Sequence, residues 1–504
     1  MGPAANAQVV SGAPDSVAVT IYRDYQGVGS DGWDAPRSGL VFVTETRTID
    51  VPAGSSRISF LGVADGMAPQ TAKLDGLPGE TIEHNFDDNL LTPGSLLAKS
   101  IGRPARLIRT NRGTGESTGQ DVVVRAAPDG VVVQTSHGLE ALNCSGAPER
   151  LVFDQAPEGL ADRPTLSVQV RAASAGRHRV QLSYLALGLG WSANYVARIR
   201  PDDQTLDLSG WITLVNPGDT SFVDAPTAVV AGTLSRVQDA DSVAHPQRAA
   251  LAPRCWPLSI DWSKPEVDVR ALARLARQSV SYPSAAPVIT VRGEASMTEL
   301  GDYKLYTLPE PTTILAHQTK QVQLLSRAGV RFDRVYGYRF DPEAQHDGGP
   351  FAAATVSLRL RNREADGLGL PLPSGTMTVM ELGPRGEPVL TGHARVQDTA
   401  VGMPFEIELG RALDVWTRPR IVAEHSMSQR GGKRVRRYAE VTIGNDKADP
   451  VRFELRQAVG EDFRVISESS RHALQAGEPL WAFTLGAGER RVLRYVAEQA
   501  SPDL

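Results

Sequence analysis

Two neighbouring runs in the middle of the chain constrain its fold more than any other segment. Residues 182–201 read LSYLALGLGWSANYVARIRP, and residues 206–216 read LDLSGWITLVN. Both runs alternate apolar and polar residues, which is the pattern of half-buried β-strands. Each contains a Gly-Trp pair, and the second leads into an Asn-Pro-Gly-Asp turn. The runs predict paired strands and contain no nucleophile, metal cluster or phosphate loop.

The same alternation recurs along the chain, and helical patterns are scarce. GLVFVTETRTIDV at 39–51 is one example, and Asp268–Gln278 is one of the few credible helices. A chain of 504 residues is too long for a single core. We therefore predict an all-β, multidomain protein with little helix. The expected units are a disordered tail or signal-peptide remnant (1–14), an N-terminal β-sandwich (15–91 plus 141–237), a small SH3-like or Sm-like barrel insertion (92–140), a linker with a short helix (238–287), a central β-domain (288–413) and a C-terminal immunoglobulin-like sandwich (414–504).

The small insertion is predicted from its helix signals. Thr92 is a good N-cap, Pro93 suits the first helical position, and Gly102 supplies a stop. Short strands separated by glycine-rich turns follow, as in small SH3-like barrels. We expect a structural role for this unit, because its basic residues are offset by acidic ones.

Charge and the beginning of the sequence bear on the compartment. The formal net charge of −5 gives no basic field for nucleic acid, and no run of 18 apolar residues predicts a transmembrane segment. Ala5-Asn6-Ala7 has the small-x-small form of a signal-peptidase site. We expect an exported protein, periplasmic or at a bacterial cell surface; the alternative interpretation is a flexible tail.

The two cysteines fit an oxidising compartment without proving it. Cys144 and Cys255 both lie in loop-like sequence and lack CxxC spacing. They either pair as a disulfide or remain free.

One cluster has the chemistry of a metal site. Glu83, His84, Asp87 and Asp88 lie within EHNFDDNL, and carboxylates with an imidazole can hold a divalent cation. The spacing matches no compact metal-binding loop, and Asp87 and Asp88 precede an expected helix start, where negative charge is stabilised. We favour a structural role, and the sequence predicts no cofactor.

Aromatic and amide side chains in the two central runs suggest a second kind of site. Carbohydrate-binding surfaces use exposed rings beside amides, which makes Trp191, Asn194, Tyr195, Trp211 and Asn216 candidate ligand-binding residues. Buried tryptophans at strand ends are the commoner outcome, so core packing is the favoured interpretation. The sequence singles out no catalytic residues, because it contains no GxSxG elbow and marks no particular pair of carboxylates.

Several motifs resemble a bacterial secreted family of unknown function that includes the mucoidy inhibitor A proteins. The most specific are LSYLALGLGWSANYVARI (182–199) and LRNREADGLGLPLPSGTMTV (360–379), and the resemblance covers the chain from about residue 74 onward. No sustained heptads occur, so the chain resembles the branch without a coiled coil. The resemblance implies a cell-envelope location and brings no catalytic residues.

We therefore expect a non-enzymatic envelope protein that binds a partner protein or a glycan. The alternative is a carboxylate- or metal-dependent hydrolase acting on an envelope polysaccharide or peptide. A third possibility is a structural scaffold, which requires stable stoichiometric partners.

Overall fold

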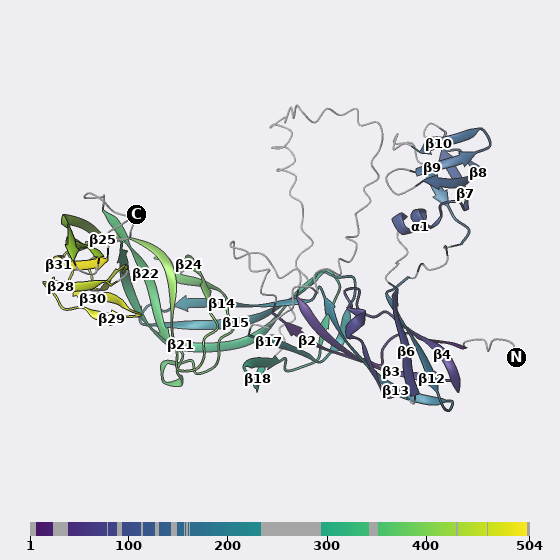
Figure 1. Ribbon diagram of the computed structural model, residues 1–504, viewed down its shortest axis with the longest axis horizontal. Coiled ribbons are helices and arrows are strands. Elements are labelled where there is room, and N and C mark those ends of the chain that lie inside the picture. Colours follow the sequence, from purple (N-terminus) through teal and green to yellow (C-terminus); the bar gives the residue numbers. More distant parts are fainter. Residues whose placement is uncertain are drawn as a thin grey trace.

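A computed structural model confirms that the chain is nearly all-β, with several mixed and antiparallel sheets. The N-terminal sheets lie at one end of an elongated molecule and the C-terminal strands at the other (Figure 1). The structure describes residues 7–500 except 24–38, 78, 88–92, 112–113, 127–130, 143–148, 156, 158–159, 161, 233–293, 342–350, 430–431 and 461.

Two sheets form the N-terminal end. The four-stranded sheet has the order β1 (Ala7–Ser11), β4 (Gly54–Leu61), β12 (Thr165–Ala172) and β6 (Gly79–Asp87). The seven-stranded sheet has the order β18 (Ser296–Leu300), β19 (Tyr303–Thr307), β17 (Thr227–Ala231), β2 (Ser16–Tyr22), β3 (Leu40–Val51), β13 (Gly176–Leu187) and β5 (Lys73–Asp75). Burial alternates along β3, as the sequence pattern predicts for a strand with one buried face. Val43 of β3 and Ile58 of β4 are fully buried in one shared core.

Strand β1 occupies part of the expected tail. It pairs in parallel with β4, from Ala7 opposite Ser56 to Ser11 opposite Phe60. Val9 packs partly buried against the shared core. Within the segment expected to be a tail (1–14), residues 7–11 therefore form an edge strand.

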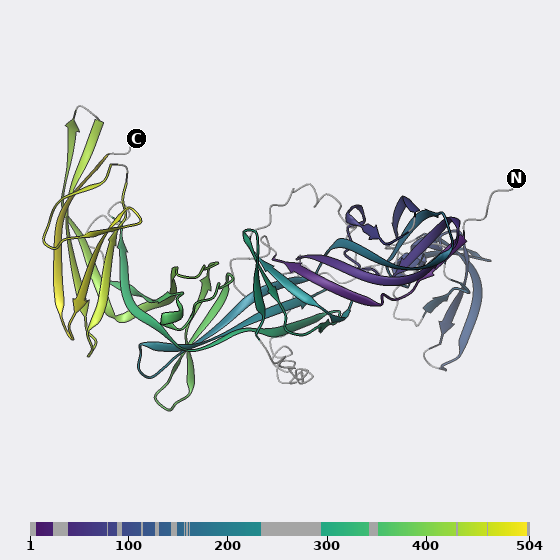
Figure 2. The ribbon, with the colours of Figure 1, turned by 90° about the horizontal axis from the view of Figure 1, so that it is seen from below.

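A large sheet of 13 strands forms the rest of the elongated body. Its main path is β24 (Pro388–Val396), β23 (Gly375–Leu382), β14 (Gly190–Ile199), β15 (Thr205–Asn216), β21 (Gln318–Phe340), β22 (Ala352–Arg361), β25 (Pro404–Gln429), β26 (Gly432–Asn445), β31 (Arg490–Ala500) and β28 (Arg464–Glu468), with β27 (Val451–Gln457), β30 (Glu478–Leu485) and β29 (Ala473–Gln475) beside it. Seen from below, the C-terminal strands run across the long axis of the molecule (Figure 2). A second core, which includes Phe453 and Trp481, lies among these strands.

Shorter elements complete the fold. The expected small unit has one helix, α1, and a five-stranded antiparallel sheet whose strands follow the order β10-β9-β8-β7-β11. Its own core contains Leu107, Val124 and Val133. The helix and the Gly102 stop, with φ +81°, agree with the sequence signals, whereas Thr92 lies outside the described residues. These elements are α1 (Pro93–Lys99), β7 (Pro104–Thr110), β8 (Ser117–Ala126), β9 (Val131–Thr135), β10 (Gly138–Leu142) and β11 (Glu149–Val152), together with β16 (Phe222–Ala225), β20 (Thr312–Ile314) and the 3-10 turns η1 (Pro69–Thr71) and η3 (Glu364–Asp366).

The sheets cross the expected boundaries between the N-terminal and central units. Strands β14 and β15, expected in the N-terminal sandwich, pair with β21 and β23 of the large sheet. Strands β18 and β19, expected in the central domain, join β17 in the N-terminal sheet. The expected linker helix at residues 268–278 lies outside the described residues.

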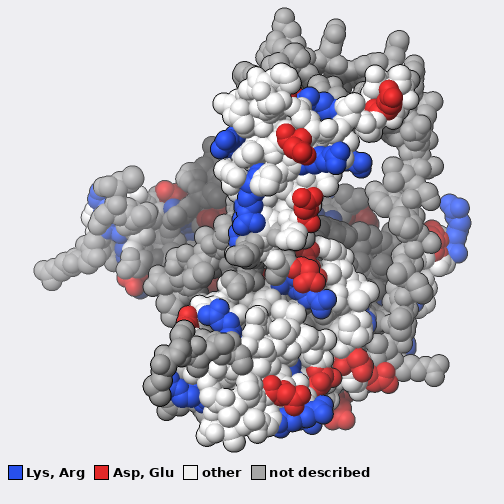
Figure 3. Space-filling model, turned by 90° about the vertical axis from the view of Figure 1, so that its right-hand side faces the viewer, with Lys and Arg blue, Asp and Glu red and all other residues white. Residues whose placement is uncertain are grey.

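Charge on one face of the molecule and the length of the described helices bear on its surroundings. Basic and acidic side chains are interspersed on the face shown in Figure 3. Within the described ranges, the helices are all too short or too polar to cross a membrane.

A buried arginine ties the two N-terminal sheets together. The Arg47 side chain is fully buried, and its Nε donates to Oε2 of Glu45 at 2.8 Å. Its two Nη atoms donate to the carbonyls of Gly12 and Leu61, both at 2.9 Å. The Tyr184 hydroxyl donates to Oε1 of Glu45 at 2.6 Å, and burial together with the Glu45 carboxylate holds the pKa of Tyr184 well above its usual value. Every charged atom of this cluster therefore has a partner, which burial of an ion pair requires.

We expect Arg47→Met to lower the free energy of unfolding by about 3–5 kcal/mol, because it leaves the Glu45 carboxylate buried without its counter-charge. Urea denaturation followed by circular dichroism measures the change. The double variant Glu45→Met/Arg47→Met should recover part of the loss, since no unpaired charge then remains. A double variant less stable than Arg47→Met would contradict this account.

Candidate functional site

Most of the predicted metal cluster lies outside the described side chains. Glu83 is exposed on β6, and its Oε1 accepts a hydrogen bond from Nδ2 of Asn85 at 2.9 Å. The side chains of His84 and Asp87, and the whole of Asp88, lie outside the described part. Among the residues that the structure describes, no group of three or more His, Cys, Asp or Glu side chains could hold a metal ion. The metal site thus stays a prediction without structural support.

The cysteine prediction stays open in the same way. Cys144 and Cys255 both lie outside the described residues, so their pairing remains a prediction.

Three of the five candidate ligand-binding residues are core residues. Trp191 and Tyr195 are each 1% exposed and Asn216 is 3% exposed. Trp191 Nε1 donates to the Val230 carbonyl at 3.3 Å, and the Tyr195 hydroxyl donates to the Pro373 carbonyl at 2.7 Å. Burial raises the pKa of Tyr195 well above its usual value. A buried ring cannot stack on a sugar, so Trp191, Tyr195 and Asn216 pack the core rather than present a binding surface.

The second Gly-Trp pair has a packing reason. Gly210 faces inward, where a Cβ atom would lie 3.1 Å from the ring of Tyr195 and 3.0 Å from Leu325. Glycine therefore makes room for the buried tyrosine. Because side chains alternate along a strand, Trp211 faces outward and is half-buried.

The remaining two candidates, Asn194 and Trp211, lie directly opposite each other on β14 and β15. The register continues this pair across the sheet: Asn194 lies opposite Thr376, and Thr376 lies opposite Arg395. On the other side Trp211 lies opposite Gln323 of β21. Directly paired residues share one face of a sheet, and all five are half-buried or exposed. We call these five residues the outer row.

Hydrogen bonds hold the middle of the outer row in place. Asn194 Nδ2 donates to Oγ1 of Thr376 at 2.9 Å, and Asn194 Oδ1 accepts from Oγ1 of Thr213 at 2.6 Å. Gln321 Nε2 then donates to Oγ1 of Thr213 at 3.1 Å. This ladder crosses four strands, so the polar groups are fixed by the sheet before any ligand arrives.

A hollow of about 540 Å³ lies at the Arg395 end of the outer row, where β24 faces β25. The two strands approach closely, since a Cβ atom on Gly392 would lie 2.6 Å from Leu409. Arg395 and Glu408 are exposed, and within the described part neither forms an ion pair. The hollow thus presents a free guanidinium and a free carboxylate. Its lining comprises Ser357, His393, Ala394, Arg395, Glu406, Glu408, Leu409 and Gly410.

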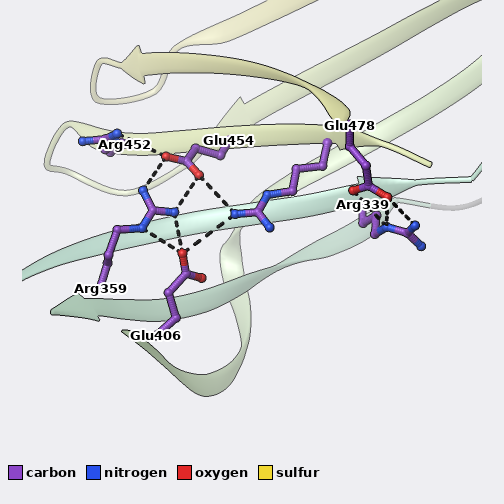
Figure 4. Close-up of polar contacts among 7 residues, drawn as sticks. Arg339, Arg359, Glu406, Arg452, Glu454 and Glu478 are labelled. Atoms are coloured by element: carbon purple, nitrogen blue, oxygen red, sulfur yellow. Dashed lines mark hydrogen bonds and ion pairs between the residues drawn. The ribbon is translucent and has the colours of Figure 1, made fainter. Parts of the chain in front are cut away.

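An ion-pair network borders the hollow at Glu406 (Figure 4). Arg359 donates from both Nη atoms to Glu454, each at 2.9 Å, and from Nε to Glu406 at 2.8 Å. Arg452 adds a bond to Glu454 at 3.2 Å. The hydrogen bond from Arg359 holds the pKa of Glu454 below its usual value. The network joins β22, β25 and β27, so one wall of the hollow is rigidly positioned.

Sequence reasoning missed Thr376, Arg395 and Glu408. The LPLPSGT motif predicts only a rigid turn, although Thr376 follows it directly. The outer row draws on five strands spread over about 200 residues, and no local pattern indicates that they pair. The one local signal is the alternation of side chains along β14 and β15, which places Asn194 and Trp211 on the outward face.

Comparisons with known proteins add no identity. No protein-family model matches this chain, and no curated protein matches it.

We expect Glu454→Gln to destabilise the protein by about 1–3 kcal/mol at pH 7, because Arg359 loses one of its two charged acceptors. The pKa of folded Glu454 lies below its ordinary value of 4.5. The carboxylate therefore contributes its full stability above pH 4.5 and loses that contribution as the pH falls through the folded pKa. Urea denaturation at several pH values should show the two proteins converging below pH 4.5. A gap that is independent of pH would contradict the assignment.

Proposed function

We propose that this protein is a non-enzymatic cell-envelope protein that binds an extended glycan along the outer row. The observation that carries the proposal is the register that places Trp211, Asn194, Thr376 and Arg395 side by side on one outward face. The envelope location rests on the signal-like Ala5-Asn6-Ala7 and on the family resemblance.

The chemistry of the row suits a hydroxyl-rich polymer. A half-buried indole ring offers an apolar face for a sugar ring, whereas the amide and hydroxyl groups beside it can exchange hydrogen bonds with sugar hydroxyls. Arg395 ends the row with a charged donor, and Glu408 in the adjoining hollow adds a charged acceptor. Five positions on five adjacent strands span about 19 Å at the usual strand spacing, so the surface fits a chain of several sugars better than one small molecule.

Finer features of the fold are part of the same proposal. Residues 414–504 form an immunoglobulin-like sandwich, residues 92–140 form an SH3-like barrel insertion, and the chain is a coiled-coil-free relative of the mucoidy inhibitor A proteins. The antiparallel pairing of β26 with β31 and the separate core of the small unit support the first two assignments.

A hydrolase acting on an envelope polysaccharide is the second candidate. Glu406 and Glu408 both line the hollow, and glycoside hydrolysis uses two carboxylates that flank the scissile bond. The Glu406 carboxylate, however, is already engaged by Arg359 in the ion-pair network. This contact favours binding over hydrolysis.

A glycan array probed with the full chain tests the proposal. We expect binding to a defined set of polysaccharides and a loss of at least about tenfold in affinity, near 1.4 kcal/mol, for Trp211→Ala. Glu408→Gln should weaken binding less, because it removes charge but keeps a hydrogen-bonding group at the edge of the surface.

Two control variants lie outside the outer row. Phe351→Ala removes another exposed ring, and Glu310→Gln neutralises another exposed carboxylate. Neither should change affinity. Binding that survives Trp211→Ala undiminished would overturn the proposal. Release of new reducing ends from a bound polymer, abolished by Glu408→Gln, would establish the hydrolase instead.

A further inference from the structure

Arg23 is a buried arginine with an incomplete set of partners. It follows β2, and its side chain is 8% exposed. Its guanidinium lies over the ring of Trp191, with the central carbon 4.8 Å from the ring centroid. The cation therefore rests on an aromatic face inside the molecule, where contact with a desolvated cation is favourable.

One nitrogen of Arg23 is fully engaged. Nη1 donates to Oγ of Ser374 at 2.7 Å and to Oδ1 of Asp398 at 2.9 Å. Asp398 is itself fixed, because its Oδ1 accepts the backbone N–H of Ser374 at 2.7 Å. These contacts hold the guanidinium in one orientation.

The opposite edge of the same guanidinium is without acceptors. Nε and Nη2 are both screened from solvent and have no hydrogen-bond partner. A guanidinium carries five N–H donors, so three remain unused. Leaving a buried donor unsatisfied costs about 1–3 kcal/mol, and more for a charged group. An acceptor bound to these N–H groups would remove this cost.

Arg47 shows how the same fold treats a structural arginine. Its side chain is fully buried, and Nε, Nη1 and Nη2 each donate to a carboxylate or a backbone carbonyl. Within the described part of the chain, Arg23 is the one arginine with two buried nitrogens that lack partners. Burial of an arginine in this fold therefore does not by itself leave Nε and Nη2 without partners.

We propose that Arg23 forms a site for a small oxyanion, a carboxylate or phosphate group, bound by the Nε and Nη2 edge. A planar guanidinium fork matches two oxygens of such a group in a bidentate pair. Ser374 and Asp398 hold Nη1 and so aim the free edge, and Trp191 supports the guanidinium plane. Because both nitrogens are screened from solvent, a ligand reaches them only when neighbouring side chains move, and this restricts the ligand to a small ion or the terminal group of a larger molecule.

The oxyanion site is independent of the proposed glycan surface. It uses Arg23, Ser374 and Asp398, none of which belongs to the outer row, and it binds a charge rather than a row of hydroxyls. Either proposal can fail without the other.

Isothermal titration calorimetry of the full chain, with inorganic phosphate and with acetate at matched ionic strength in chloride, tests the site. We expect saturable binding of one ion per chain. Arg23→Lys keeps the charge but removes the fork, and it should weaken binding at least tenfold. Asp398→Asn removes the negative charge 2.9 Å from Nη1 and should strengthen binding several-fold.

Arg385→Lys, an exposed arginine in the turn between β23 and β24, is the matched control and should bind as the wild type does. Binding of acetate alone assigns a carboxylate ligand, and binding of phosphate alone assigns a phosphate. No saturable binding of either anion, or equal binding by Arg23→Lys, would overturn the site. If Arg23→Lys fails to fold by circular dichroism, Asp398→Asn decides, because an unchanged affinity in that variant contradicts the proposed edge.

Discussion

Two long strands, β21 and β25, determine how the whole body is assembled. The first part of β21 pairs with β15, from Gln318 to Arg331, and its last part pairs with β22 and, in parallel, with β27. β25 pairs first with β22 and then with β26. One unbroken backbone thus supplies hydrogen bonds first to the part of the large sheet around β15 and then to the C-terminal strands around β27. Strand register, rather than a linker, therefore sets the positions of these two parts of the sheet.

This continuity explains why the polar features lie where they do. The outer row exists because β24, β23, β14, β15 and β21 are consecutive in one sheet, so five residues from distant segments align. The ion pairs of Arg359 with Glu406 and Glu454 bridge β22 to β25 and β27. Arg47 performs a similar role between the N-terminal sheets. Each cluster fixes strands that the apolar core alone would hold less specifically.

The sequence predicted strands well and their partners poorly. Alternation in GLVFVTETRTIDV identified β3 almost to the residue, because one-sided burial imposes a period of two. Partners follow from contacts between distant segments, such as the parallel pairing of β14 with β23, which no local pattern encodes. Trp191 and Trp211 illustrate the limit: both follow glycine, yet one faces the core and the other faces outward. The buried charges of Arg23 and Arg47 also went unmarked, since arginine ordinarily predicts an exposed position.

The continuous path of β21 and β25 has a mechanical consequence. Where two domains are joined by a flexible connection, tension first straightens that connection. Here a pull along the length of the molecule loads the ladder between β15 and β21 in shear, because these strands run along the long axis (Figure 1), and the bonds of this ladder must break together rather than one by one. The same backbone thus carries the load from the strands beside β15 to the C-terminal strands beside β27.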